Sequence, residues 1–315
     1  MGEPQPHTRT RTLAPFLVMK QRLRTEARDL IELVLLPGLA AILPWAWCFV
    51  LFRSLAQWQW LYRAPCNEAL AQARVRGWVG QDEAQWIWRR RLVTLVDHAD
   101  HYLGLWRSDA WMKRHLHVTG QWPTVGHTVL LTTFHWGTGY WGLRSAAAHG
   151  LRTHALVATL ESPAYQGRTI LTWYARARNA NVARTLGAPT IDIVHRLRDV
   201  VRALRANKAL LGLIDIPSDD AKASITVDVL GLKASVPRGL MRLVVDHQVP
   251  VVLYVTGLNI EDGSRFLHIQ ALKTGDNVEA LATCLFNELD RLIRSDVPAW
   301  HFWSIAERFF PASAQ

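Results

Sequence analysis

The fold is decided by the stretch TVLLTTFHWGTGYWGLRSAAAHGLRTHALVATL, residues 128–160. Its first part, 128–134, is a short apolar run rich in β-branched residues, which predicts a buried strand. Residues 138–149 have the spacing of a helix that ends at Gly150, and 154–160 form a second strand-like run. A strand, a helix and a strand in this order predict two parallel strands joined by a crossover helix.

The same alternation continues along the chain. Helices are predicted at 166–180, 195–207, 237–247 and 276–295, and strands at 209–215, 225–231, 249–257 and 266–272. Residues 54–118, before the first strand, are amphipathic and predicted helical. This pattern predicts an α/β fold, with a mainly parallel sheet that carries helices on both faces.

An apolar run precedes the helical region and reads LVLLPGLAAILPWAWCFVLF. Its 20 uncharged residues, 33–52, match the roughly 20 residues that a helix needs to cross a bilayer. Pro37 and Pro44 interrupt it, so we expect one kinked span or a segment that enters the bilayer and returns. A helix buried in a soluble core is the alternative. We expect a basic membrane anchor over 1–60 and an α/β domain over 61–315, on the cytoplasmic face of the inner membrane.

Composition and charge narrow the classes of function. Half of the 315 residues are hydrophobic, and 36 basic against 26 acidic side chains give a formal net charge of +10. That charge suits an anionic partner, such as inner-membrane lipids or an acidic carrier protein. Three scattered cysteines give no disulfide framework. The basic residues are not gathered on one nucleic-acid-binding motif, and the sequence has no hydrolase elbow, NTPase loop or zinc-protease signature.

His135 directly follows the first predicted strand, and its surroundings support two hypotheses. Ligands of open α/β sheets bind beyond the carboxyl ends of the strands, where a histidine can act as general base toward a hydroxyl. The next helix can offer N–H groups to an oxyanion. Alternatively, Gly137, Gly139 and Gly142 form a G-x-G-x-x-G frame, with Glu161 at the end of the second strand, which outlines an NAD(P)-binding fingerprint.

The segment FHWGTGYWGL, residues 134–143, resembles a motif of the lipid A biosynthesis lauroyl/myristoyl acyltransferases, within the lysophospholipid acyltransferase superfamily. Members have a catalytic His followed, after four residues, by Asp or Glu, usually as His-aromatic-Gly-Asn-x-Glu. His135, Trp136 and Gly137 match, and Thr138 replaces the Asn. The blocks at 172–188, 194–220 and 225–255 resemble the family's later blocks in order, which places Asp215 on the family's Asp.

One position departs from the family motif. Tyr140 stands where the acid belongs, and a phenol with an ordinary pKa near 10 supplies no negative charge at neutral pH. Either another carboxylate reaches His135, with Asp215 the first candidate and Glu161 the second, or His135 acts unaided on an already activated thioester. The third possibility is a site that only binds. We name His135, Asp215 and Tyr140 as the candidate catalytic residues.

The resemblance also implies substrate-binding residues. Arg176 and Arg178 resemble the family's arginines and would hold a phosphate or a carrier-linked pantetheine, or else form a solvated basic helix face. Independently of the resemblance, Arg238 flanks a turn that would face an anionic substrate. The expected binding set is Gly137, Thr138, Arg176, Arg178 and Arg238. The cluster of Asp97, His98, Asp100 and His101 has metal-like spacing but lies in an amphipathic helix, and is interpreted as a solvated face. We expect neither a metal nor a cofactor.

The sequence therefore predicts an acyltransferase. It would move an acyl group from acyl carrier protein or acyl-CoA to a hydroxyl or amine of a membrane-associated lipid or glycolipid acceptor, with His135 as general base. An alternative from a different class is a catalytically impaired, membrane-anchored binding or assembly subunit, which the missing motif acid favours.

Overall fold

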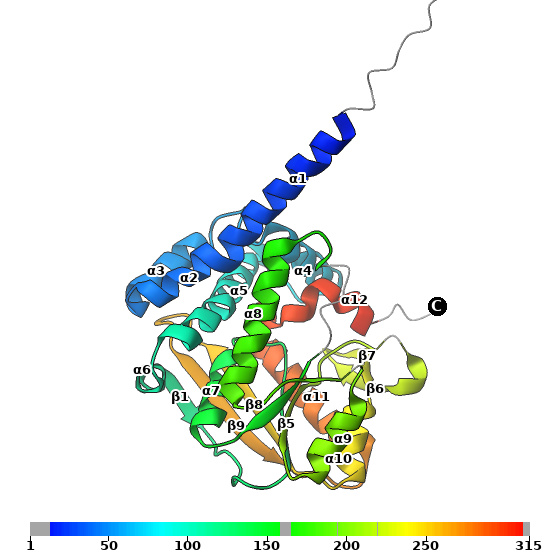
Figure 1. Ribbon diagram of the computed structural model, residues 1–315. Helices are drawn as coiled ribbons and strands as arrows, with labels where there is room; N and C mark the ends of the chain where they lie inside the picture. Colours follow the sequence, from blue (N-terminus) through cyan, green and yellow to red (C-terminus); the bar gives the residue numbers. More distant parts are fainter. Residues whose placement is uncertain (1–12, 158–164, 194, 219, 311–315) are drawn as a thin grey trace, which may run out of the picture.

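The computed structural model describes residues 13–157, 165–193, 195–218 and 220–310 (Figure 1). In these residues seven strands form one sheet in the order β1-β9-β8-β2-β5-β3-β4. Neighbouring strands are parallel throughout, except for the antiparallel pair of β8 and β9. The strands are β1 (Leu116–Thr119), β2 (Val129–Thr133), β3 (Thr153–Val157), β4 (Ile191–Asp192), β5 (Ala209–Leu213), β8 (Val251–Leu258) and β9 (Arg265–Leu272). The expected mainly parallel α/β sheet is confirmed.

Burial explains why these segments are strands. β2 lies at the centre of the sheet between β8 and β5, and all five of its residues are buried. A strand covered on both faces reads as a continuous apolar and β-branched run, which is the sequence VLLTT. β8 is buried at all eight positions, whereas β9 alternates between buried and exposed residues over most of its length. The sheet is therefore most completely buried where β2 and β8 pair.

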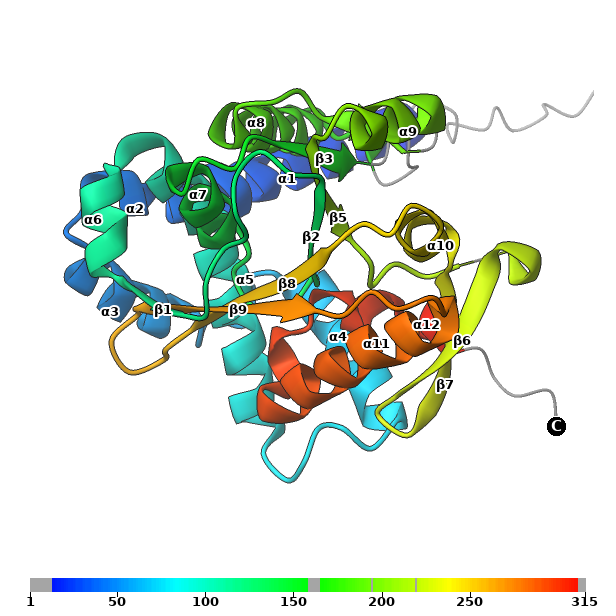
Figure 2. The same cartoon turned by 90° about the horizontal axis from the view of Figure 1, so that it is seen from below.

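Helices cover both faces of the sheet. Figure 2 shows α7 and α8 on one side, and α10 and α11 on the other. The helices that follow the first strand are α7 (Tyr140–Ala148), α8 (Thr169–Leu186), α9 (Leu197–Arg205), α10 (Gly239–Asp246) and α11 (Val278–Ser295). After α11 the chain makes two 3-10 turns, η4 (Val297–Ala299) and η5 (His301–Ile305), and the short α12 (Ala306–Phe309). A further 3-10 turn, η3, covers Ala221–Ala223.

Two segments differ from the predicted elements. Residues 225–231 do not join the main sheet, because β6 (Ser224–Val229) pairs with β7 (Leu232–Pro237) in a separate antiparallel hairpin. Its turn places Leu230 and Gly231 at positive φ, the geometry of a tight hairpin. β1 lies inside the region predicted as helical. It is four residues long and mostly exposed, so it has no apolar period to reveal it.

The apolar run at 33–52 is divided among several elements. α1 (Leu13–Leu30) continues through a π-helical turn, η1 (Ile31–Leu35), into α2 (Leu36–Ile42), and Pro44 precedes α3 (Trp45–Leu55). No helix of the described residues combines the length and the apolar character that crossing a bilayer requires. This finding corrects the expectation of one kinked span.

Part of this run packs against the sheet. Trp45, Phe49 and Phe52 are buried in the same hydrophobic core as β2 and β8. The indole Nε1–H of Trp45 donates to the carbonyl of Gly263 at 3.0 Å, and a Cβ on Gly263 would lie 2.6 Å from the Phe49 ring. Residues on both sides of the boundary expected at residue 60 therefore belong to one core. The remaining helices of this region are α4 (Arg63–Val75), α5 (Glu83–Trp106) and α6 (Asp109–Arg114).

Candidate active site at the carboxyl ends of β2 and β5

The strand register brings His135 and Asp215 together. β2 and β5 are parallel neighbours, paired from Val129 opposite Ala209 to Thr133 opposite Leu213. The two candidate residues each lie two positions beyond the last of these pairs and are 80 residues apart, as the paired residues are. The carboxyl ends of parallel strands are where ligands of open α/β sheets bind.

Asp215 is fully buried and accepts hydrogen bonds on both oxygens. The backbone N–H of His135 donates to Oδ1 at 3.0 Å and to Oδ2 at 2.9 Å, and the ring Nδ1 of His135 lies 2.9 Å from Oδ1. The indole Nε1–H of Trp300 donates to Oδ2 at 3.1 Å. Because a carboxylate only accepts, this contact places the ring hydrogen of His135 on Nδ1 and leaves a lone pair on Nε2.

The segment after α11 holds His135 from the other side. The backbone N–H of His301 donates to the carbonyl of His135 at 2.7 Å, and the ring of Phe302 stacks on the imidazole with 4.0 Å between centroids. The ring Nε2 of His301 lies 2.8 Å from the carbonyl oxygen of Gly137. Both the backbone and the ring of His135 are therefore fixed by contacts from η5.

Arg90 of α5 secures that segment in turn. Its buried guanidinium donates to the carbonyl oxygens of Pro298 and Trp300 at 3.1 and 2.9 Å, and to that of His301 at 2.9 Å. Each of these hydrogen bonds stabilises the segment, because a charged donor that serves three backbone carbonyls holds the turns of η4 and η5 against α5.

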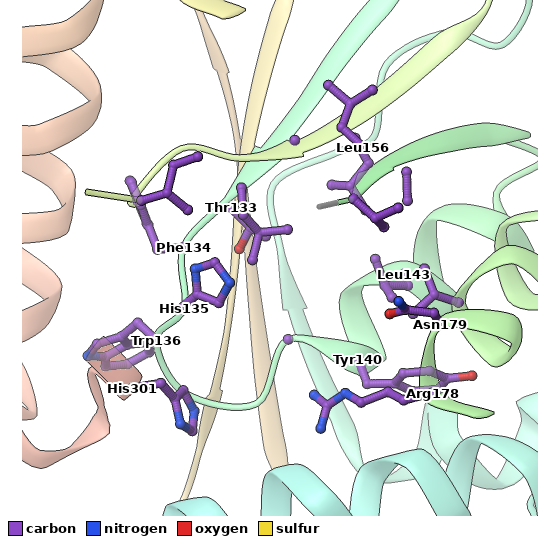
Figure 3. Close-up of a pocket in the computed structure, with 18 of the residues that line it drawn as sticks. Thr133, Phe134, His135, Trp136, Tyr140, Leu143, Leu156, Arg178, Asn179 and His301 are labelled. Carbon is purple, nitrogen blue, oxygen red and sulfur yellow. The ribbon is translucent and has the colours of Figure 1, made fainter. Parts of the chain in front are cut away.

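A cavity of about 590 Å³ opens beside His135. The close-up in Figure 3 shows the imidazole of His135 at its edge, with Leu143 and Leu156 on the opposite side. The polar part of the lining includes Asp97, Thr133, Arg178, Asn179 and His301. The apolar lining includes Leu143, Leu156, Val182, Leu211, Leu240 and Tyr254. The cavity can therefore receive a long apolar group next to the imidazole.

Tyr140 does not take the place of the motif acid. Its hydroxyl lies 2.6 Å from Oγ1 of Thr185 on α8, and Figure 3 shows that hydroxyl directed away from His135. Burial raises the pKa of the phenol above 10, so it stays neutral. Gly104 makes room for the ring, since a Cβ there would lie 2.0 Å from it. Tyr140 lines the cavity but is not positioned to orient His135, which corrects its expected catalytic role.

Close packing accounts for two of the glycines that follow His135. Gly137 adopts φ +70°, and a Cβ on it would lie 2.3 Å from the carbonyl oxygen of Thr256 in β8. A Cβ on Gly142 would meet the ring of Tyr254 at 2.4 Å. Gly137 and Gly139 line the cavity, whereas Thr138 is buried and its N–H donates to Thr256. Thr138 therefore does not face the cavity, contrary to its expected binding role.

The expected arginines separate into one inside the cavity and two outside it. Arg178 lines the cavity and donates to Asp97 at 2.9 Å. Arg176 is exposed and Arg238 half-buried at the start of α10, and neither contributes to the lining. The binding role expected for Arg176 and Arg238 finds no support in this cavity and stays a prediction. Glu161 lies outside the described residues.

The cluster at Asp97–His101 is not a solvated face. Asp100 and His101 are buried, and Asp100 pairs with the buried Arg265. Burial lowers the pKa of His98 to about 3 and that of His101 to about 4, so both imidazoles are neutral. Although burial opposes ionisation, Arg178 keeps the pKa of Asp97 below its ordinary value. Within the described residues no group of these side chains could hold a metal ion.

Neither a comparison with models of known protein families nor a search of curated proteins finds a match to this chain. The site's chemistry is therefore argued from its own geometry. The sequence analysis missed Trp300, His301 and Phe302, which surround His135. The available signal was AWHFW at 299–303, because three aromatic rings and an imidazole within five residues are unusual outside a core or a site.

Proposed function

We propose that this protein is an acyltransferase that moves an acyl group from a thioester of acyl carrier protein or coenzyme A to a hydroxyl or amine of a membrane-associated lipid or glycolipid. One observation carries the proposal: the imidazole of His135 has its Nδ1 on a buried carboxylate and lies at the edge of a largely apolar cavity. A general base and a chain-binding pocket are what such a transfer needs side by side.

The reaction begins when Nε2 of His135 takes the proton from the acceptor hydroxyl or amine. The acceptor atom attacks the thioester carbonyl carbon, and the carbonyl oxygen becomes a tetrahedral oxyanion. When the oxyanion collapses, the carbon–sulfur bond breaks and the imidazolium returns its proton to the leaving thiolate. The products are an ester or amide and a free thiol. Asp215 stabilises the imidazolium between the two proton transfers.

The first turn of α7 is the candidate site for the oxyanion. Gly139 and Tyr140 lie at the start of this helix and line the cavity. The first N–H groups of a helix have no partner within the helix, and the helix dipole favours negative charge there. Backbone donors that are already in place stabilise a developing oxyanion without reorganisation.

The resemblance of residues 134–143 to the lipid A acyltransferase motif supports the same reaction. In those proteins an acid five residues after the histidine orients it, whereas here Asp215, just beyond the neighbouring strand, contacts His135 and would take that role. The hypothesis of a merely binding subunit rested on the missing acid and loses that support. We place the protein at the cytoplasmic face of the inner membrane, where a carrier protein and a lipid acceptor can meet.

The proposal is tested by acyl transfer from labelled acyl carrier protein and labelled acyl-CoA to a total lipid extract, with products identified by mass spectrometry. We expect His135→Ala to lower the rate by about 10²–10⁴-fold, the range of a general base. The control is His247→Ala, an exposed histidine at the end of α10 that does not line the cavity. If the wild type transfers from neither donor and His135→Ala keeps its biological role, the protein is a binding subunit. Binding of NAD(P) to the pure protein would instead favour the dinucleotide hypothesis.

A further inference from the structure

A second cavity, of about 750 Å³, lies apart from His135 between the end of α3, the turn at 56–62 and the first turns of α4 and α5. The lining is mainly polar and basic, and its charged residues are Arg53, Arg63, Arg91 and Asp82. Nothing in the proposed acyl transfer uses these residues.

The arginines of this cavity have spare hydrogen-bonding capacity. Arg91 is only 5 % exposed, and its buried Nε has no hydrogen-bond partner within the described residues. Its Nη2 donates to the carbonyl of Gln59 at 3.3 Å. Arg53 and Arg63 are exposed at the mouth, and no ion pair involves any of the three within the described residues. A buried, unpaired guanidinium donor calls for an anionic acceptor.

Acidic groups hardly offset this charge. Asp82 is the one carboxylate in the lining within the described residues, and it already accepts from the backbone N–H of Gln85 at 2.8 Å as the cap of α5. The cavity therefore keeps an excess of positive charge. A phosphate oxygen can accept from a guanidinium in the bidentate geometry that arginine favours.

Exposed apolar side chains beside the cavity indicate the source of the phosphate. Trp58 and Trp60, in the turn between α3 and α4, are 49 % and 41 % exposed, and their rings lie 5.6 Å apart. On α3, Val50 is 63 % exposed and precedes Arg53 by three residues, so the two are neighbours on the helix surface, and Trp47, three residues before Val50, is 72 % exposed. Tryptophan beside basic residues is typical of the bilayer interface, and a free phosphate needs no such apolar rim.

We propose that this arginine cavity binds the phosphate of an anionic lipid headgroup, with Trp58 and Trp60 set in the interfacial zone of the bilayer. The proposal does not depend on the chemistry at His135. It connects with that site through α5, because Arg91 precedes the cavity residue Asp97 by six residues, about 9 Å along the helix axis. A bound headgroup would thus fix the orientation of the active-site cavity relative to the membrane.

The test is co-sedimentation with vesicles of phosphatidylcholine alone and of phosphatidylcholine with phosphatidylglycerol. Removing one basic residue near an anionic surface weakens binding about fivefold, so Arg53→Ala/Arg63→Ala should lose about 30-fold on the anionic vesicles. The matched control is Arg198→Ala/Arg205→Ala, which removes two exposed arginines from α9, at the far end of the molecule (Figure 1). We expect the control to change binding less than twofold, and Trp58→Ala/Trp60→Ala to weaken binding to both kinds of vesicle.

Three results would overturn the proposal. One is unchanged vesicle binding of Arg53→Ala/Arg63→Ala, and another is an equal loss in the α9 control, which would mean that net charge alone decides. The third is that inorganic phosphate binding, followed by ³¹P NMR, depends on Arg53 and Arg63 while vesicle binding does not, which would make this a site for a soluble phosphate. His135→Ala should bind anionic vesicles as the wild type does, so failure of the acyl-transfer proposal would be separately visible.

Discussion

Asp215→Asn tests the central contact of the site, because it exchanges a carboxylate for an amide of the same shape. In the wild type both oxygens of Asp215 receive N–H groups, from the backbone and ring of His135 and from the indole of Trp300. An asparagine amide has one oxygen and one NH₂, so its NH₂ group must face a donor in either orientation.

The two orientations have different consequences. If the NH₂ group faces the imidazole, Nδ1 of His135 must accept, which moves the ring hydrogen to Nε2 and removes the proposed base. If it faces Trp300, two N–H groups meet in a fully buried site. A buried donor without an acceptor costs about 1–3 kcal/mol, so the free energy of unfolding should fall by about that amount. The transfer rate should fall by about 10²–10⁴-fold.

The measurements are independent of one another. Chemical denaturation gives the free energy of unfolding, and ¹⁵N-labelled histidine shows by NMR which ring nitrogen of His135 carries hydrogen. The control is Asp220→Asn, because Asp220 is an exposed carboxylate that accepts a hydrogen bond from the backbone N–H of Lys222. This substitution should lower the free energy of unfolding by no more than about 0.5 kcal/mol. If Asp215→Asn keeps the Nδ1–H tautomer, full stability and full transfer activity, then Asp215 does not orient His135 and the reasoning is refuted.

Other expected outcomes follow from neighbouring residues. Gly137→Ala should lose at least about 1–3 kcal/mol of folding stability in urea titrations, because Gly137 has a positive φ and a Cβ there would clash with the carbonyl of Thr256. The control Gly139→Ala, whose Cβ would meet nothing within 4 Å, should leave the stability nearly unchanged. Equal stabilities of the two variants would contradict the loop geometry. Tyr140→Phe should keep the transfer rate within a few-fold and lose about 1 kcal/mol with its bond to Thr185, and a rate as low as that of His135→Ala would restore Tyr140 to the catalytic set. Burial lowers the pKa of His301 from 6.5 to about 4, so the unfolded state binds more protons between these values. His301 should therefore contribute a fall in stability of up to about 3 kcal/mol as the pH falls from 6.5 toward 4, and His301→Gln should remove that share while those of His98 and His101 remain.

The sequence predicts the elements well wherever burial imposes a period. The central strands VLLTT and ALLGL are continuous apolar runs, and His135 and Asp215 lie two residues beyond their ends, so both candidates could be named in advance. Their contact could be proposed only as one option. It depends on β2 pairing with β5 and not with β3, and that choice is made by packing across 80 residues of chain.

Two predictions about side-chain surroundings, at the Asp97–His101 segment and at Tyr140, failed because tertiary packing decides what a helix face contacts. The Asp97–His101 segment has the charge of a solvated face, yet α5 is surrounded by α2, α4, α7 and α8, which bury it. Tyr140 occupies the position of a motif acid, but the start of α7 turns its side chain toward α8. Neither fact is visible in local sequence, because each depends on which elements pack together.

The contact between Asp215 and Trp300 also has a consequence for biosynthesis. The two residues are separated by 85 positions, and a ribosome that adds about 5–20 residues per second needs about 4–17 s to make the intervening chain. During that interval the nascent polypeptide contains Asp215, which is buried in the folded protein, but lacks the Trp300 indole that donates a hydrogen bond to it. Translation thus delays completion of the site around Asp215 until Trp300 emerges, and a message truncated before codon 300 would yield a product that chaperones and proteases should recognise as unfinished.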